Sequence, residues 1–328
     1  MYIDCALVLH EKALIARIRG EAKRSGAFLD GGIGIGDDCA VVRIPPGHEA
    51  LLTTDFSLEN IHFRRAWHPA QSVGHRCLTR GLSDIAAMGG EPRAAFLSLA
   101  LPRNLPQSWV DGFLRGLLKL AADFRVKLAG GDTAEFPDRI LADIVVLGSV
   151  PKGKAVLRSG ARPGDNIYVT GELGASAATL NLLSRRRKKL RPPDFARHFY
   201  PVPRIEIGRF IREKRLASAM IDLSDGLSTD LGHICEEGGV GAELETETIP
   251  VATIGKPGWE VDLRSALHGG EDYELLFTAP RGKRVPSRIA GVAVTLIGHV
   301  IGERRVFLRD RKGTKQELPR QGWEYFKR

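Results

Sequence analysis

The sequence predicts a two-domain α/β protein of the α+β type. Strands and helices alternate along both halves of the chain, and turn-forming residues cluster around residue 151, where a new unit begins. The 328 residues are enough for two hydrophobic cores, and a content of 43% hydrophobic and 27% charged residues is ordinary for a soluble globular protein. We therefore expect an N-terminal domain over residues 1–150 and a C-terminal domain over residues 151–328.

The N-terminal half is expected to begin with an amphipathic helix over residues 11–24, because Leu14, Ile15 and Ile18 recur at helical spacing. A second helix is expected over residues 70–88, closed by two glycines, and a third over residues 107–124 with Ser108 as its N-cap. Strands are expected over residues 39–44, 49–56, 94–102, 126–133 and 140–150.

The C-terminal half is expected to open with a turn-rich segment over residues 151–165 and a strand over residues 166–174. A helix over residues 175–183, a strand entering a turn over residues 217–227, and a helix over residues 228–239 follow. Strands and helices then alternate to the end of the chain.

The net charge of +9 would suit a nucleic-acid-binding protein, but it is local. The run SRRRKKLR (184–191) holds six of the 48 basic residues, and without it 42 basic residues face 39 acidic ones. No aromatic residue interrupts this run, as a single-strand-binding surface would require. The run is therefore expected to be a solvated surface segment.

The cysteines argue for a reducing, cytoplasmic location. Cys5, Cys39, Cys77 and Cys235 lie far apart with no C-x-x-C pair, which disfavours both a zinc site and a disulfide framework. The chain has no run of about 18 apolar residues for a membrane helix, and its first twenty residues lack a signal-peptide cleavage site.

The loop GIGIGDDCAVV (32–42) combines glycines with two adjacent carboxylates, Asp37 and Asp38. Bare glycine backbone suits a phosphate, whereas carboxylates repel one, so a cation between them would reconcile the two. The loop is no Rossmann fingerprint, because it lacks G-x-G-x-x-G before a helix, and no P-loop motif occurs in the chain.

Further aspartates occupy the ends of predicted strands and helices. Asp55, Asp132, Asp222 and Asp225 follow strands, and Asp84 lies in the last turn of a helix, where the macrodipole disfavours an anion by about 0.3–1 kcal/mol. Each acid alone could be a turn residue or a helix cap. Together they indicate sites for Mg²⁺, which prefers carboxylate and phosphate oxygens.

Seven segments occur in the order and spacing found in the thiamine-monophosphate kinase family. They are GIGDDCAVV, TTDFSLENIHF, LSDIAAMGGEP, AGGDT, LRSGARPGD, IDLSDGLSTDLGHI and GGEDYELLFT. The chain resembles this family over nearly its whole length, up to GWEYF. AGGDT and the acidic loops alone would indicate only the wider superfamily, which includes aminoimidazole ribonucleotide synthetase, selenophosphate synthetase and a hydrogenase maturation factor. IDLSDGL, GGEDYEL and NIHF narrow the resemblance to the thiamine enzyme.

The resemblance implies an ATP-dependent kinase that converts thiamine monophosphate to thiamine diphosphate with several Mg²⁺ ions. It also implies a homodimer, in which the N-terminal, ATP- and metal-binding domains pair their sheets into a barrel, while the C-terminal domain is a separate α/β unit. Neither a membrane nor a specific nucleic acid is implied as a partner.

The same resemblance assigns roles to individual residues. The metal ligands would be Asp38, Thr53, Thr54, Asp55, Asp84, Asp132, Asp222 and Asp225. The nucleotide contacts would be Gly131, Asp132, Arg158 and Ser224, and the residues facing thiamine monophosphate would be His62, Glu271 and Trp323. Asp132, Arg158 and Asp222 would be the catalytic residues. A purely structural role remains an alternative for several of these residues. Thr53 and Thr54 could simply favour a strand, Arg158 could be a surface residue, His62 could pack against its neighbours, and Glu271 could be a turn residue.

Three other functions are weighed against this one. A selenophosphate synthetase would want a reactive cysteine in its N-terminal loop, and Cys5 has no supporting motif. A hydrogenase maturation factor would end in a cysteine-containing tail, whereas this chain ends WEYFKR. A basic RNA-binding protein on an inactive kinase fold would have no use for an intact set of acids.

Overall fold

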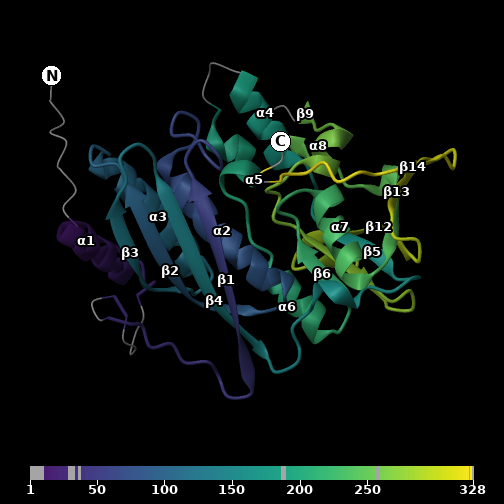
Figure 1. Cartoon of the computed structure of the whole chain (residues 1–328), viewed down its shortest axis with the longest axis horizontal. Coiled ribbons are helices and arrows are strands. Elements are labelled where there is room, and N and C mark those ends of the chain that lie inside the picture. Colours follow the sequence, from purple (N-terminus) through teal and green to yellow (C-terminus); the bar gives the residue numbers. More distant parts are fainter. Residues whose placement is uncertain are drawn as a thin grey trace. The chain divides into compact units, whose positions relative to one another are not determined.

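The computed structural model describes residues 11–28, 34–35, 38–185, 190–255, 259–324 and 326. The chain divides into two compact units, the first made of Met1–Ile85 with Glu91–Pro151 and the second of Ala86–Gly90 with Lys152–Arg328. Both units combine a sheet with helices (Figure 1), so the predicted mixed α/β class is confirmed. Asp37, Cys5 and residues 186–189 of the basic run lie outside the described residues.

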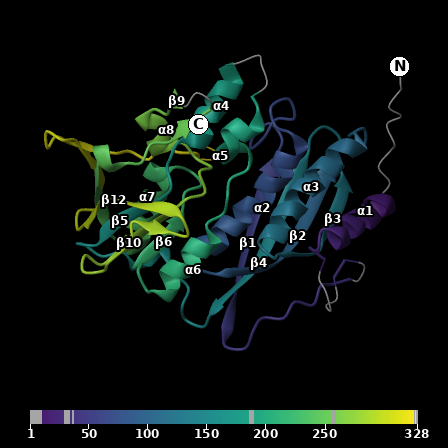
Figure 2. The same cartoon turned by 180° about the vertical axis from the view of Figure 1, so that it is seen from behind.

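The first unit is a four-stranded sheet with helices over one face. Its strand order is β1–β4–β2–β3, in which β4 is antiparallel to both neighbours and β2 is parallel to β3. The strands lie in front of α2 and α3 in Figure 1, and these helices lie in front in Figure 2. The elements are α1 (Glu11–Arg24), β1 (His48–Leu58), α2 (Ala70–Ala87), β2 (Glu91–Leu101), α3 (Gln107–Asp123), β3 (Lys127–Glu135) and β4 (Leu141–Pro151).

The two faces of this sheet differ because side chains alternate along each strand. On β4 the alternate residues Ala142, Ile144 and Val146 are fully buried, and they form the core with the apolar side of α3. The opposite face carries large apolar side chains that stay exposed, including Leu52 at 71% and Phe56 at 56%. The sheet thus has one covered face and one open face.

Two local expectations are wrong. Residues 40–45 contain no strand, and Val41 is 52% exposed, because this apolar run gains no sheet neighbour before Pro45 and Pro46 turn the chain into β1. Helix α3 begins after Pro106, whose φ of −59° suits a helix start, so Ser108 lies inside the first turn and caps nothing.

The second unit is built on a sheet of eight strands in the order β14–β13–β7–β12–β5–β10–β6, with β11 paired to β12. Two hydrophobic clusters form its core, one centred on Ile221, Leu231 and Leu276 and the other on Ile211 and Phe277. Among the described helices, none has the length and apolar content needed to cross a lipid bilayer.

The elements of the second unit are β5 (Asn166–Thr170), α4 (Ala175–Arg185), α5 (Ala196–Phe199), α6 (Ile205–Glu213), β6 (Ala219–Asp222), α7 (Leu227–Gly238), β7 (Gly241–Glu245), β8 (Thr253–Ile254), β9 (Trp259–Glu260), α8 (Leu263–His268), β10 (Leu275–Ala279), β11 (Arg288–Ile289), β12 (Val292–Ile301), β13 (Val306–Arg309) and β14 (Lys315–Glu317). Short 3-10 turns occur at η1 (Arg158–Gly160), η2 (Pro192–Phe195) and η3 (Thr246–Thr248).

Candidate active site

Thr53, Asp55 and Asp84 meet between strand β1 and helix α2. Residues 53 and 55 alternate with the exposed residues 52, 54 and 56, so their side chains point toward the helix. The Thr53 hydroxyl donates a hydrogen bond to Oδ2 of Asp84, and a further side-chain hydrogen bond joins Asp84 to Asp55. Three of the predicted metal ligands therefore form one group, which we call the β1–α2 acid group.

Electrostatics in this group favour a bound cation. Burial raises the pKa of Asp55 to about 7, and the neighbouring charge of Asp84 is the next largest cause. Arg80, one turn earlier on α2, lowers that pKa, whereas Asp143 raises it. In the metal-free chain the two carboxylates thus hold a proton near neutral pH, and a divalent cation could replace it.

Thr54 lies on the other face of β1. Its hydroxyl donates to Oδ1 of Asp143 at 2.8 Å, beside the exposed Phe56. A metal ion held by the side chains of Thr53 and Asp55 would therefore not reach the Thr54 hydroxyl. The structure separates these two neighbouring residues into different environments.

Asp132 also belongs to a different part of the sheet. Asp132 pairs with Ser98, Ser98 with Asp143, and Asp143 with Phe56, so the four residues form a row across all four strands. Three strand spacings, about 14 Å in total, separate the two ends of this row. One Mg²⁺ ion, with ligands at about 2.1 Å, cannot be shared by the Asp132 and Asp55 side chains of one chain.

The AGGDT segment on β3 has the backbone of a close-approach site. Gly131 has φ of +148°, and a Cβ there would lie 1.8 Å from the carbonyl oxygen of Leu97, so only glycine fits. Asp132 is exposed and accepts the N–H of Thr133 at 2.8 Å. The Thr133 hydroxyl is buried with no hydrogen-bond partner in the described part of the chain, and a ligand at this edge could satisfy it.

In the second unit, Asp222 and Asp225 bracket the turn from β6 into α7. Asp222 ends the strand and is 3% exposed. The backbone N–H groups of Asp225 and Gly226 donate to Oδ2 of Asp230, at 3.1 and 3.0 Å, so Asp230 satisfies the start of the helix. Burial, followed by the charges of Asp222 and Asp225, raises the pKa of Asp230 well above its usual value.

Backbone hydrogen bonds bring three more predicted residues to this turn. The N–H of Glu271 donates to the carbonyl of Ser224 at 2.8 Å, and the N–H of Trp323 donates to the carbonyl of Asp225 at 3.0 Å. Trp323 is 51% exposed, which leaves its ring accessible. Ser224, Asp225, Glu271 and Trp323 are thus assembled from three segments far apart in the sequence.

Arg158 begins the 3-10 turn η1 and is exposed. The pKa of His233 on α7 is lowered by burial, then by the charge of Arg320, and then by the charge of Arg158. His233 also offers a ligand atom within 4.8 Å of those of Asp225 and Asp230. Arg158 therefore lies near the Asp225 turn.

His62 follows β1 in a tight turn. The backbone N–H of Leu58 donates to Nδ1 of His62 at 2.9 Å, so the proton of a neutral ring is on Nε2. His62 and Arg80 line the same small cavity of about 10 Å³, and Arg80 also acts on Asp55. Asp38 is exposed in the bend at residues 38–39, outside the elements that form these groups.

Comparison with known proteins identifies the family of this chain. Residues 36–150 match the family model "AIR synthase related protein, N-terminal domain", and residues 162–311 match "AIR synthase related protein, C-terminal domain". The thiamine-monophosphate kinase of Escherichia coli K12 is 38% identical over 328 residues, which cover 96% of this chain and 98% of that protein. The chain belongs to the thiamine-monophosphate kinase family.

Solved structures of this family have the same fold. The thiamine-monophosphate kinase of Stenotrophomonas maltophilia superposes with a TM-score of 0.76 at 30% identity, covering 90% of this chain and 95% of that one. A structure described as AaThiL complexed with AMPPCP and TMP superposes with a TM-score of 0.75 at 31% identity, covering 97% and 99%. The predicted family is confirmed and is favoured over the other members of the superfamily.

Four residues that lie beside these groups were not singled out from the sequence. They are Arg80, Asp143, Asp230 and His233. The spacing of Arg80 and Asp84, four residues apart on a predicted helix, was an available signal. Asp143 carried none, because only the pairing of β4 with β1 brings it to Thr54.

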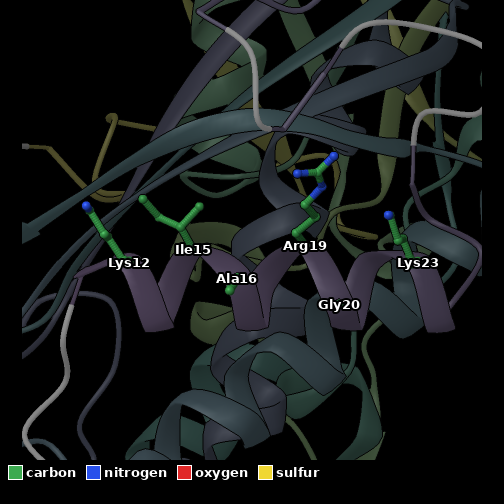
Figure 3. Close-up of a pocket in the computed structure, with 6 residues that line it drawn as sticks. All are labelled: Lys12, Ile15, Ala16, Arg19, Gly20 and Lys23. Atoms are coloured by element: carbon green, nitrogen blue, oxygen red, sulfur yellow. The ribbon is translucent and has the colours of Figure 1, made fainter.

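A shallow hollow of about 570 Å³ lies along α1 and is lined by Lys12, Ile15, Ala16, Arg19, Gly20 and Lys23. Figure 3 shows the side chains of Lys12, Ile15 and Arg19 projecting from the same side of this helix. None of the residues with a predicted role in this family lines the hollow, so the volume of this hollow does not identify it as the active site.

Proposed function

We propose that this protein transfers the γ-phosphoryl group of ATP to thiamine monophosphate, giving ADP and thiamine diphosphate. Membership of the thiamine-monophosphate kinase family supports the reaction, and a relative at 31% identity has been solved with AMPPCP and TMP. The structural observation that carries the proposal is the β1–α2 acid group, an oxygen-only cluster of a hydroxyl and two carboxylates.

We further propose that Thr53, Asp55 and Asp84 hold Mg²⁺, with Asp222 and Asp225 as a second set of ligands. Their donor atoms are all oxygens, which is the chemistry that Mg²⁺ prefers. A bound Mg²⁺ supplies positive charge that offsets the repulsion between two phosphates. Asp38, Thr54 and Asp132 are proposed as ligands of further ions, which fits the separation of Asp132 from Asp55 across the sheet.

With thiamine monophosphate as the acceptor, the reaction needs no general base. A phosphate monoester has a second pKa of about 6, so the attacking oxygen of thiamine monophosphate is mostly ionised at neutral pH. The protein's task is then to align donor and acceptor and to offset their charge. We expect direct transfer without a phosphoenzyme.

The remaining site residues bind and orient the two substrates. The guanidinium of Arg158 suits a phosphate, because its N–H groups can donate in pairs. His62 donates from Nε2, since the N–H of Leu58 occupies Nδ1. The carboxylate of Glu271 suits the positive thiazolium ring of thiamine, and the exposed ring of Trp323 offers a stacking surface.

We also propose a homodimer formed through the open face of the first unit's sheet. Leu52 and Phe56 are exposed there, with Phe96, Val145 and Leu147 half-buried beside them. An apolar sheet face of this kind marks an association surface, and the same patch on two copies can form an isologous contact. A cytoplasmic location is supported by the unpaired state of Cys39, Cys77 and Cys235.

The decisive experiment measures thiamine diphosphate formation from ATP and Mg²⁺ with either thiamine monophosphate or free thiamine as acceptor. We expect turnover with the monophosphate and little with thiamine, because the hydroxyl of thiamine would need a base to activate it. Equal or faster turnover of thiamine would contradict the proposed specificity, and no turnover of the monophosphate would refute the function.

A further inference from the structure

The segment Gly269–Glu274, which we call the strap, carries Glu271 and has an unusual backbone. Glu271 has φ of +65° and Tyr273 has φ of +52°, two non-glycine residues in the left-handed region within one short irregular segment. Such conformations cost about 1–3 kcal/mol each and persist only where surrounding contacts enforce them. Asp272 and Glu274 make the side-chain contacts that link this segment to the rest of the unit.

Asp272, between the two left-handed residues, fastens the strap to the start of helix α4. Its Oδ2 accepts the N–H of Gly174 at 2.7 Å, and its Oδ1 accepts the N–H of Ser176 at 3.4 Å. Helix starts have N–H groups without partners in the helix, so a carboxylate is well placed there. The carboxylate lies on a segment about a hundred residues away in sequence, so it links two parts of the unit.

Glu274 fastens the other end of the strap. It is 3% exposed and forms a two-pronged ion pair with Arg204, the residue that precedes α6. The hydroxyl of Thr170 on β5 donates to Oε2 of Glu274 at 2.6 Å and accepts the N–H of Leu275 at 2.8 Å. The Glu274 side chain is therefore held by Thr170 on strand β5 and by Arg204 at the start of helix α6.

Around Asp272 the strap lies against the turn that carries the acids of the second unit. The N–H groups of Glu271 and Tyr273 donate to the carbonyls of Ser224 and Leu223, at 2.8 and 2.9 Å. A Cβ at Gly270 would lie 2.4 Å from the carbonyl oxygen of Ser224, so the approach requires glycine. A displacement of the strap would therefore move Glu271 directly.

We propose that Asp272 and Glu274 are positioning residues that hold the strap in its strained form and thereby aim Glu271 at the substrate. The inference rests on the proposed function, in which Glu271 faces thiamine monophosphate. Neither residue touches the substrate in this account; both act through Glu271.

The test uses the full chain with Asp272→Asn, and Asp262→Asn as a matched control. Asn keeps the size of Asp272, but the NH2 group that replaces one carboxylate oxygen donates and cannot accept the N–H of Gly174 or Ser176. Asp262 also caps a helix in this unit, where its Oδ1 accepts the N–H of Ser265 at 2.6 Å at the start of α8. Both variants should melt a few degrees lower than the wild type.

Kinetics then separate positioning from a general loss of stability. We expect Asp272→Asn to lower kcat/KM for thiamine monophosphate by about 30-fold or more, since a misplacement of about 1 Å can cost 100-fold. Asp262→Asn should lower it less than about threefold. In a Glu271→Ala background, Asp272→Asn should have little further effect, because residues that act through one group are not additive. Equal losses in both backgrounds, or equal losses from the two Asn variants, would overturn the proposal.

Hydrogen exchange makes the result independent of the reaction. In the substrate-free protein, Asp272→Asn should speed exchange of the Glu271 and Tyr273 amides, and Asp262→Asn should not. If Asp272→Asn fails to fold, Thr170→Val removes a partner of Glu274 and should show the same exchange pattern with a smaller kinetic loss. Unchanged exchange in a folded variant contradicts the inference, whereas a wild type without turnover refutes only the proposed function.

Discussion

Replacing Asp84 with Asn separates a metal ligand from a structural acid. In the β1–α2 acid group the pKa of Asp55 is raised from 3.8 to about 7, a difference worth about 4 kcal/mol in total. Burial is the larger cause, so we assign about 1 kcal/mol of this to the charge of Asp84. The macrodipole at the end of α2 adds about 0.5 kcal/mol against the same carboxylate.

Without metal, Asp84→Asn should therefore raise the free energy of unfolding by about 1.5 kcal/mol at a pH of about 8, where Asp55 is charged, which is about 3 °C in Tm for a chain of this size. The gain should shrink near pH 6, because Asp55 is then protonated. The Asn side chain still accepts the Thr53 hydroxyl. At the same time turnover should fall at least about 100-fold, or about 2.7 kcal/mol.

The assay pairs thermal melts in a chelator with rates at saturating ATP and Mg²⁺. Asp123→Asn is the matched control, because Asp123 is also an acid at the end of a helix, α3, and pairs there with the exposed Lys119. Its rate should be unchanged. A less stable Asp84→Asn protein whose folded fraction keeps full activity would refute the assignment of Asp84 as a ligand.

Four further outcomes are expected. Thr53→Val should reduce turnover more than Thr54→Val does, because the Thr53 side chain faces Asp84 and the Thr54 side chain does not. Thr53→Val should also raise the Mg²⁺ concentration that gives the half-maximal rate. A larger loss of turnover in Thr54→Val would contradict this prediction. In the metal-free protein the Tm should fall as pH rises from about 5 to 8, because the folded chain holds protons on Asp55 and Asp272 that the unfolded chain has already lost; burial raises the pKa of each to about 7. Saturating Mg²⁺ should remove only the Asp55 part of this dependence, and an unchanged dependence would contradict the assignment of Asp55 as a ligand. Phe56→Asp should shift the sedimentation coefficient toward a monomer, and an unchanged value would argue against the open-face dimer. Substituting the six basic residues of 184–191 should leave turnover within about threefold while removing weak, salt-sensitive RNA binding; a large loss with intact folding would place this run at the substrate.

The sequence was a good guide where one physical signal dominates. Helix α2 was expected over residues 70–88 from its apolar spacing and its terminal glycines, and it spans Ala70–Ala87. The strand expected over residues 39–44 failed, because an apolar run becomes a strand only where a neighbouring strand accepts its hydrogen bonds. That neighbour is a property of the tertiary fold.

In the candidate site, too, the features set by local sequence could be predicted, and those set by the tertiary fold could not. The motifs placed Thr53, Thr54 and Asp55 together, and simple alternation along a strand could already have put Thr54 on the opposite face. The distance of Asp132 from Asp55 could not be foreseen, because it depends on the strand order β1–β4–β2–β3. Asp230 lies in the first turn of α7 and was missed because its role depends on the fold of the preceding turn, which brings the N–H groups of Asp225 and Gly226 to its carboxylate.

The left-handed backbone at Glu271 and Tyr273 bears on how this chain responds to selection. Glycine or asparagine at 271 would relax the backbone and raise thermal tolerance, since these residues adopt positive φ at little cost. The same change would delete the carboxylate that we propose faces thiamine monophosphate. A laboratory screen for heat resistance alone would thus enrich stable, inactive variants at this position, so the screen must also demand thiamine diphosphate for growth.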